Sequence, residues 1–137
     1  MAATIITNAV ITINSVDLSA HISKVEISEE IEEHDTTNFA SGGFVERIGG
    51  LGDATFTVDM FQDWGAAAVN ATISPIVGTV VPVKVKPTSG AISATNPEYQ
   101  FNVTILEWTP LSAAVGEVPT VSVSWPISGV ITVDITP

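Results

Sequence analysis

The stretch that decides the fold is NPEYQFNVTILEWTPLSAAVGEVPTVSVSWPISGVITVDITP, residues 96–137. In its first part, large apolar side chains occupy every second position: Tyr99, Phe101, Val103 and Ile105. The same alternation returns further along, at Val121, Val123 and Trp125. Because successive side chains of a strand point to opposite faces of a sheet, both parts are predicted to be half-buried strands.

After Trp125 the chain is predicted to turn back on itself. Pro126 has no N–H to donate, so it is expected to end the pairing of its strand. Ser128-Gly129 is predicted to be a tight hairpin turn, because glycine adopts positive φ at little cost. A return strand with three apolar residues would then follow: Ile131, Val133 and Ile135.

Strand patterns also fill most of the chain before residue 96. Alternation predicts strands at about residues 5–13, 25–31, 54–62 and 79–87. Glu29 falls on the apolar face of its strand, which indicates a bulge or an exposed strand end. Pro82 indicates that its own strand has an edge position or a bulge.

Two segments depart from this pattern. Residues 63–74 are the helical candidate, with Asp63 as N-cap and Pro75 as the stop. Residues 34–52 are rich in Thr, Asn, Ser and Gly and are predicted to be a long loop. Residues 1–137 are therefore expected to form one mainly β domain, a β-sandwich or barrel of two packed antiparallel sheets flanked by one α-helix.

Composition limits the functions open to this chain. It has no cysteine, which excludes disulfides and thiolate metal sites. Its mean hydropathy is +0.41, which fits either large subunit contacts or an ordinary β-rich core. The net charge is −11, so binding nucleic acid through phosphate contacts is not expected, although DNA could slide past without sticking. Neither a secretory signal nor a membrane span is predicted.

No residue pattern indicates catalysis, a metal site or a cofactor. His21 and His34 lack metal-ligand spacing, and no serine lies in a G-x-S-x-G turn. The glycine-rich residues 49–53 lack the Lys-Ser/Thr of a phosphate-binding loop and lead into a strand, so a flexible turn is predicted there. We expect no catalytic, cofactor-binding or metal-binding residues and no enzymatic activity.

Several weak motifs resemble, in their order, the tail tube proteins of long-tailed bacteriophages. They are V-D-L-S at 16–19, D-T-T-N at 35–38, the passage 50–61, Asp63-Trp64, N-P-E-Y-Q-F at 96–101 and the final S-G pair. The resemblance covers most of the chain. It implies an orthogonal β-sandwich flanked by a helix, in a chain that forms hexameric rings. It also implies that the rings stack into a tube whose lumen carries DNA.

The same resemblance implies a location and partners. The protein would be made in the host cytoplasm and reside in the tail of the virion. Its partners would be further copies of itself, other tail proteins at the tube ends, and DNA passing through without specific binding; no membrane is implied. Some relatives carry an appended C-terminal immunoglobulin-like domain, which is not expected here.

Two sets of residues are candidates for roles in such a tube. Within the predicted loop, the apolar residues and the arginine are expected to order against a neighbouring subunit: Phe39, Phe44, Val45, Arg47 and Ile48. In the acidic run from residue 26 to residue 35, Glu26, Glu30 and Glu32 are candidates for the lumen face. A negative wall would keep a passing polyanion mobile. A simple solvated outer face is the competing interpretation.

A different class of function stays open. A small adhesive or carbohydrate-binding β-sandwich would need an exposed aromatic platform, for which three residues are available: Trp64, Trp108 and Trp125. These residues are instead expected to serve as core or interface anchors, since aromatic side chains mostly serve packing. A hydrolase with an unrecognised site is the third hypothesis.

Overall fold

The structure is a computed structural model that describes residues 5–136. Seven strands form one antiparallel sheet in the order β2-β1-β5-β6-β7-β4-β3. The strands are β1 Val10–Ile13, β2 Val16–Asp17, β3 Ile22–Asp35, β4 Arg47–Phe61, β5 Val80–Lys86, β6 Glu98–Thr104 and β7 Thr120–Asp134. The helical segments are η1 Ser19–His21, η2 Phe39–Ser41, α1 Val69–Ile73 and η3 Ser74–Ile76. The prediction of a mainly β fold is confirmed.

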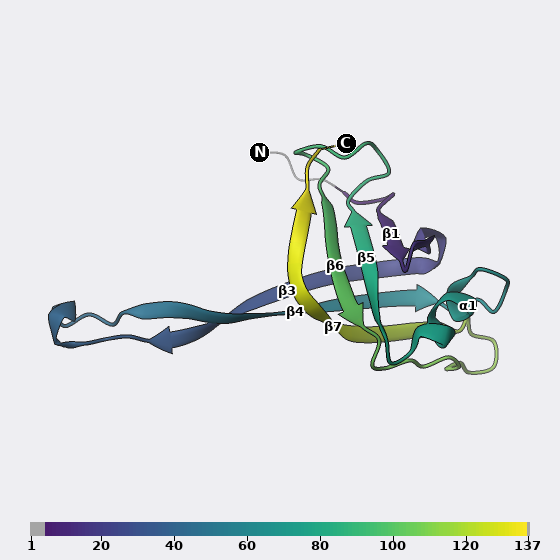
Figure 1. Ribbon diagram of the computed structural model, residues 1–137. Helices are drawn as coiled ribbons and strands as arrows, with labels where there is room; N and C mark the ends of the chain where they lie inside the picture. Colours follow the sequence, from purple (N-terminus) through teal and green to yellow (C-terminus); the bar gives the residue numbers. More distant parts are fainter. Residues whose placement is uncertain (1–4, 137) are drawn as a thin grey trace.

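Strand β7 divides this sheet into two layers. Its residues 120–126 pair with β4, whereas its residues from 127 onward pair with β6. In Figure 1 the layer of β3 and β4 crosses the layer of β5 and β6, and β7 bends from one layer into the other. The predicted two layers are therefore halves of one continuous sheet that is not closed into a barrel, with β2 and β3 at its edges.

The bend in β7 replaces the predicted hairpin turn at Ser128-Gly129, which was wrong. Gly129 has a φ of 90°, but the chain continues in the same strand to Asp134. The pairing with β6 shifts there, because Gln100 lies opposite Thr132 while Asn102 lies opposite Ser128. Extra residues on one strand bend that strand. The positive φ of Gly129 therefore belongs to a bulge at which β7 bends, and not to a turn that reverses the chain. Pro126, opposite Thr55, is the last residue of β7 that pairs with β4, as predicted, but the strand itself continues and pairs with β6 from Ile127 onward.

We expect Gly129→Ala to lower the free energy of unfolding by about 1–3 kcal/mol, because an L-residue is strained at this positive φ. A Cβ at this position would meet no atom within 4 Å, so the loss would come from backbone strain alone. Urea unfolding of the variant measures it. Gly90→Ala is the control, since a Cβ at Gly90 makes only an ordinary contact of 3.6 Å. Equal stability of the two variants would contradict the prediction.

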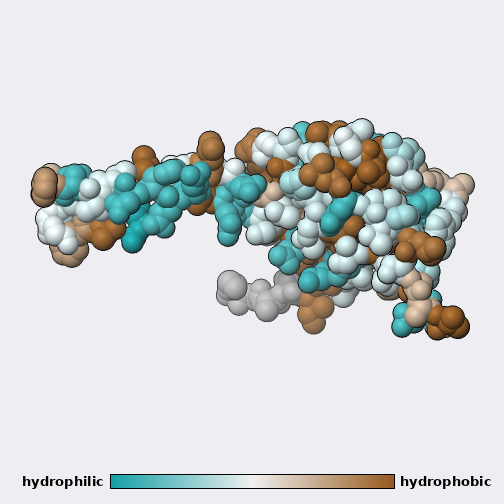
Figure 2. Space-filling view, turned by 90° about the horizontal axis from the view of Figure 1, so that it is seen from below, coloured by the Kyte–Doolittle hydropathy of each residue, from teal (hydrophilic) through white to brown (hydrophobic). Residues whose placement is uncertain are grey.

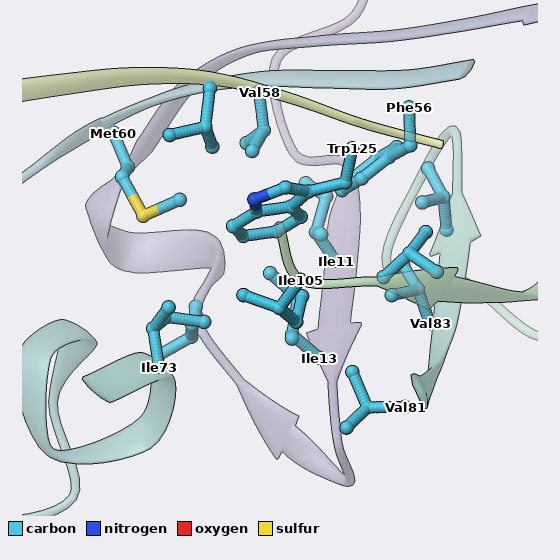
Figure 3. Close-up of a cluster of buried hydrophobic side chains, with 14 of the residues drawn as sticks. Ile11, Ile13, Phe56, Val58, Met60, Ile73, Val81, Val83, Ile105 and Trp125 are labelled. Atoms are coloured by element: carbon cyan, nitrogen blue, oxygen red, sulfur yellow. The ribbon is translucent and has the colours of Figure 1, made fainter. Parts of the chain in front are cut away.

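The hydrophobic core fills the space between the two layers (Figure 3). Trp125 is fully buried, and its indole Nε1 donates a hydrogen bond to the carbonyl oxygen of Glu107 at 2.8 Å. The ring of Phe56 lies 6.3 Å from that of Trp125 and 5.3 Å from that of Phe101. The predicted apolar faces are confirmed as core at six positions: Phe101, Val103, Ile105, Val121, Val123 and Trp125.

The opening strand is shorter than predicted. β1 begins only at Val10, which lies opposite Lys86 at the end of its ladder with β5. A two-residue turn follows β1, with positive φ of 51° at Asn14 and 67° at Ser15. Two consecutive residues with positive φ are typical of the tight hairpin that joins β1 to β2. Ile5, predicted to lie in the opening strand on the same face as Ile11 and Ile13, is instead 86% exposed.

The helix is also shorter than the predicted residues 63–74. α1 has five residues, and Asp63 does not cap it but accepts a hydrogen bond from the Gly65 N–H at 2.8 Å. Ala67 has a φ of 57°, which breaks any helix through residues 63–68. Pro75 lies in the first turn of η3, a position that needs no N–H donor. Among the described residues, no helix is long and apolar enough to cross a membrane.

Pro82 and Glu29 both fit regular pairing. Pro82 lies in β5, an interior strand, opposite Asn102 of β6. Its carbonyl accepts the Asn14 N–H at 2.8 Å, so its nitrogen faces the same side, just beyond Ile13 opposite Val83, the last residue pair of β1 with β5. Glu29 lies opposite Ala54 without a bulge, and it is exposed because β3 leaves the core there.

Candidate assembly site on the β3–β4 hairpin

A long hairpin projects from the body of the molecule (Figure 1). β3 and β4 pair from Ile22 opposite Met60 as far as Asp35 opposite Arg47. None of residues 28–53 is buried, and we call this segment the arm. The predicted loop at residues 34–52 was therefore wrong over much of its length, because only residues 36–46 lie outside the two strands.

Glycines explain why this part of the arm did not look like a strand. Gly49, Gly50 and Gly52 give no alternation of side chains, yet all three are paired or flanked by pairs in β4. A Cβ at Gly50 would lie 2.5 Å from Nε2 of His34, so glycine makes room for a large side chain from β3. Gly49 and Gly52 leave similar room for Ile31, with 3.1 Å to its side chain.

Hydrogen bonds order the tip of the arm, residues 36–46. The Thr36 N–H donates to the carbonyl oxygen of Glu46 at 2.9 Å, and the Ser41 hydroxyl donates to the Glu46 carboxylate at 2.9 Å. Asn38 caps η2 by accepting the Ala40 N–H at 2.9 Å. Hydrogen bonding from Thr37, through its side chain and then its backbone, holds the pKa of Asp35 below its ordinary value of 3.8. The tip is thus a defined turn with a charged carboxylate at its base.

The candidate interface residues all lie at or near this tip. Their exposed fractions are 110% for Phe39, 76% for Phe44, 56% for Val45 and 58% for Ile48. Arg47 pairs across the hairpin with Glu33 of its own chain, so a neighbour's carboxylate would have to share or replace that partner. Figure 2 shows the arm as a mostly hydrophilic rod with hydrophobic residues at its far end and at a few points along it.

Two further exposed apolar residues of the arm were missed from the sequence. Ile31 is 58% exposed and Leu51 is 79% exposed. In the sequence, Ile31 continues the alternation of Val25 and Ile27, which indicates a buried face, and Leu51 lies within the predicted flexible turn at residues 49–53. The signal that separates Ile31 from core residues is the glycine on the facing strand, since Ile31 lies opposite Gly52, whereas Leu51 lies at the register shift between the pairs of Ile31 and Glu33.

The three candidate lumen residues share one face of β3. Glu26, Glu30 and Glu32 occupy alternate positions of the strand, and all are exposed. Asp53 lies opposite Glu30 on β4 and adds a carboxylate to the same face, which the sequence did not reveal. Only Lys24 adds a positive charge to this face of β3. This face can repel anions but has few groups that could bind them.

The remaining candidates do not form a chemical site. His34 Nε2 lies 3.0 Å from Glu32 Oε1, and His21 Nε2 lies 3.8 Å from Asp63 Oδ2. Across residues 5–136, no cluster of three or more potential metal ligands occurs. The tryptophans do not form an exposed platform: Trp125 is buried, Trp108 is partly buried against the core and Trp64 is 52% exposed.

Solved structures share this fold. One is a chain in the virion of a native gene transfer agent (GTA) particle, with a TM-score of 0.74 and 17% identity over 96% of this chain and 98% of that one. Another belongs to the tail of an empty GTA particle with C6 symmetry, with a TM-score of 0.58 and 14% identity over 82% and 81%. No family model and no curated protein matches the chain. At such identities the likeness establishes the fold, which is the one expected from the resemblance to tail tube proteins.

Proposed function

We propose that this protein is a structural, non-enzymatic component of a virion tail. Copies of it join head to tail into rings, six subunits to a ring, and the rings stack into a tube through which DNA passes. Support comes from the fold, which it shares with chains in a GTA virion and in a GTA tail of C6 symmetry. A fold alone does not define a function, so the proposal depends also on surface features of this chain.

The arm is the observation that carries the proposal. None of its residues 28–53 is buried in the subunit, yet several of them have large apolar side chains that are exposed to solvent. Apolar groups gathered on a projecting element are typical of a contact with another protein. Within residues 5–136, no strand pairs with the outer edge of β3 along its 14 residues, and a free edge is a template for pairing with another chain.

The geometry of these features favours a head-to-tail contact, between two different surfaces of the subunit. The other edge of the sheet, β2, has only two residues, so the two edges are not equivalent. An interface between two different surfaces generates a ring when its rotation closes and a filament when it does not. A tail tube needs both kinds of contact, within a ring and between rings.

Electron microscopy of the purified protein tests this proposal. Negative-stain images and light scattering at physiological salt are expected to reveal rings or tubes, with sixfold symmetry in end views. Each contact is expected to bury more than about 2,000 Å² in total, as obligate assemblies do. A monodisperse monomer at high concentration, with no polymer after addition of nuclei, would contradict it.

We further propose that Glu26, Glu30 and Glu32 face the lumen of the tube. Their exposure on one strand face supports this, as does the net charge of −11. Tubes of Glu30→Lys are expected to retain short duplex DNA at low salt, because each added cation can release counterions from phosphate. Tubes of Glu117→Lys, which changes a carboxylate on an exposed loop, are the control. DNA retention by both variants alike, or a tube reconstruction with Glu30 on the outside, would contradict a lumen position.

A further inference from the structure

A groove opens between the two layers at the base of the arm. Its volume is about 440 Å³, which lies within the size range of pockets that hold small molecules or single side chains. Most of its lining is apolar, including Ile6, Ala9, Val25 and Val133, and its charged members are Glu29 and Lys86. Val133 at this groove is 49% exposed, so the site is accessible in the single subunit.

The tip of the arm offers an apolar side chain that this groove could receive. Phe39 is 110% exposed and protrudes from η2, where the capping hydrogen bonds of Asn38 fix the backbone. The tip cannot reach the groove of its own subunit. Glu29 lines the groove and Asp35 ends β3, so the paired strand carries the tip about 20 Å away, at about 3.3 Å per residue. Only another copy can bring its tip to this groove.

The distribution of charge also favours contact between the arm of one copy and the groove of another. The arm carries seven carboxylates against one arginine: Glu29, Glu30, Glu32, Glu33, Asp35, Glu46 and Asp53 against Arg47. The other three basic residues of the chain lie on the body, and Lys86 lines the groove. Lys24 lines a second hollow, which shares Ile6, Ala9 and Val25 with the groove. An acidic arm arriving at this part of the body would meet two of those lysines.

We propose that the groove is the receptor for the arm tip of a second copy, with Phe39 as the inserted side chain. This inference rests on the proposed function and names the surface at which its head-to-tail contact forms. An apolar knob and a complementary pocket at different places on one molecule produce a heterologous contact. Each subunit therefore gives one arm and receives another, which propagates the assembly.

Cross-linking tests the contact directly, because the chain contains no cysteine that would interfere. In the double variant Ala40→Cys/Val133→Cys, a short bifunctional thiol reagent is expected to join assembled subunits into a ladder of covalent oligomers. Ala40→Cys/Val77→Cys is the matched control. Val77 is 44% exposed and follows η3, which continues directly from α1. α1 lies at the end of the body away from the arm (Figure 1). A ladder in the control only, or in neither variant when both form tubes, would overturn the docking proposal and leave the tube proposal intact.

A double-mutant cycle gives an independent measurement. Phe39→Ala is expected to raise the protein concentration needed for assembly by about tenfold to a hundredfold, as expected for loss of one buried apolar side chain. Combined with Val133→Ala it should cause little further rise, because both variants remove the same contact. Combined with Val77→Ala the effects should simply add. Additive effects at Phe39 and Val133, or a small molecule found in the groove of assembled tubes, would overturn the proposal. Failure of the unmodified protein to assemble would overturn the proposed function as well.

Discussion

Replacing residues 36–46 with a two-residue Asn-Gly turn is expected to give a folded subunit that does not form tubes. Asp35 and Arg47 lie directly opposite each other, so a two-residue hairpin can join them without disturbing the strands. None of the removed residues is buried, so the free energy of unfolding should change by no more than about 1 kcal/mol. Assembly should be lost because Phe39 and Phe44 are removed with the tip.

Thermal unfolding by circular dichroism and negative-stain microscopy measure these two effects separately. Phe39→Ser/Phe44→Ser keeps the length of the tip and should also fail to assemble, which separates side-chain contacts from arm length. Ala40→Ser, an equally exposed change between them, is the control and should form normal tubes. Normal tubes from the shortened chain would show that the tip is not an assembly element.

Trp125→Ala is expected to remove about 3–5 kcal/mol of stability, as truncation of a buried aromatic side chain does. Trp125 has no exposed surface, contacts Phe56 in the core and is hydrogen-bonded to Glu107. Because domains are stable by only about 5–15 kcal/mol, this single change can leave much of the protein unfolded. Loss of the indole also frees the carbonyl of Glu107, at the start of the connection that leads to β7.

Urea unfolding followed by far-ultraviolet circular dichroism measures the Trp125 effect without relying on tryptophan fluorescence. Trp125→Phe should lose less, because it keeps an aromatic ring and gives up only the hydrogen bond and part of the packing. Val130→Ala lies in the same strand at 82% exposure and should change stability by less than about 0.5 kcal/mol. A loss for Trp125→Ala no greater than for Val130→Ala would refute the assignment of Trp125 as the central core residue.

Alternation of apolar and polar residues was enough to predict the core strands. It succeeded from Tyr99 to Ile105 and from Val121 to Trp125 because those strands have one buried face and one exposed face, which is the condition the pattern detects. It failed on the arm, where both faces are exposed and glycine carries no side chain to alternate. A strand held by its partner strand alone leaves little trace in the sequence.

The wrong predictions at Gly129 and at residues 63–68 have a different origin. A bend and a reversal both need a residue with positive φ, and Gly129 suits either. What decides between them is which strand lies beside the next residues, and that strand is β6, distant in sequence from the pairing of β7 with β4. At residues 63–68, alanine-rich sequence favoured a helix, but the turn from Asp63 to Gly65 and the positive φ of Ala67 prevail.

The candidate interface was predictable only in part. Exposed apolar residues in a polar segment, such as Phe39 and Phe44, can be recognised from sequence because they have no partners in a regular pattern. The groove could not be recognised, because its lining comes from β3, β5, β6 and β7 and from residues before β1. Side chains so far apart in sequence form one surface only after the whole sheet has folded.

The arm joins residues that are close in sequence, whereas the groove joins residues that are far apart in sequence. This difference affects the order in which the two features can form. Asp35 and Arg47 pair across a short loop, and hairpins of this kind form in about 1–10 μs. Ile13 pairs with Val83, and β4 with β7, across about half of the chain, and such topologies fold in about milliseconds to seconds. The strands of the arm can therefore begin to pair long before any copy has a groove. Growth of the polymer is then limited by the slowest-folding part of each subunit. A partly folded chain can present an arm, but it has no groove to receive one. Such a chain ends a growing polymer instead of extending it.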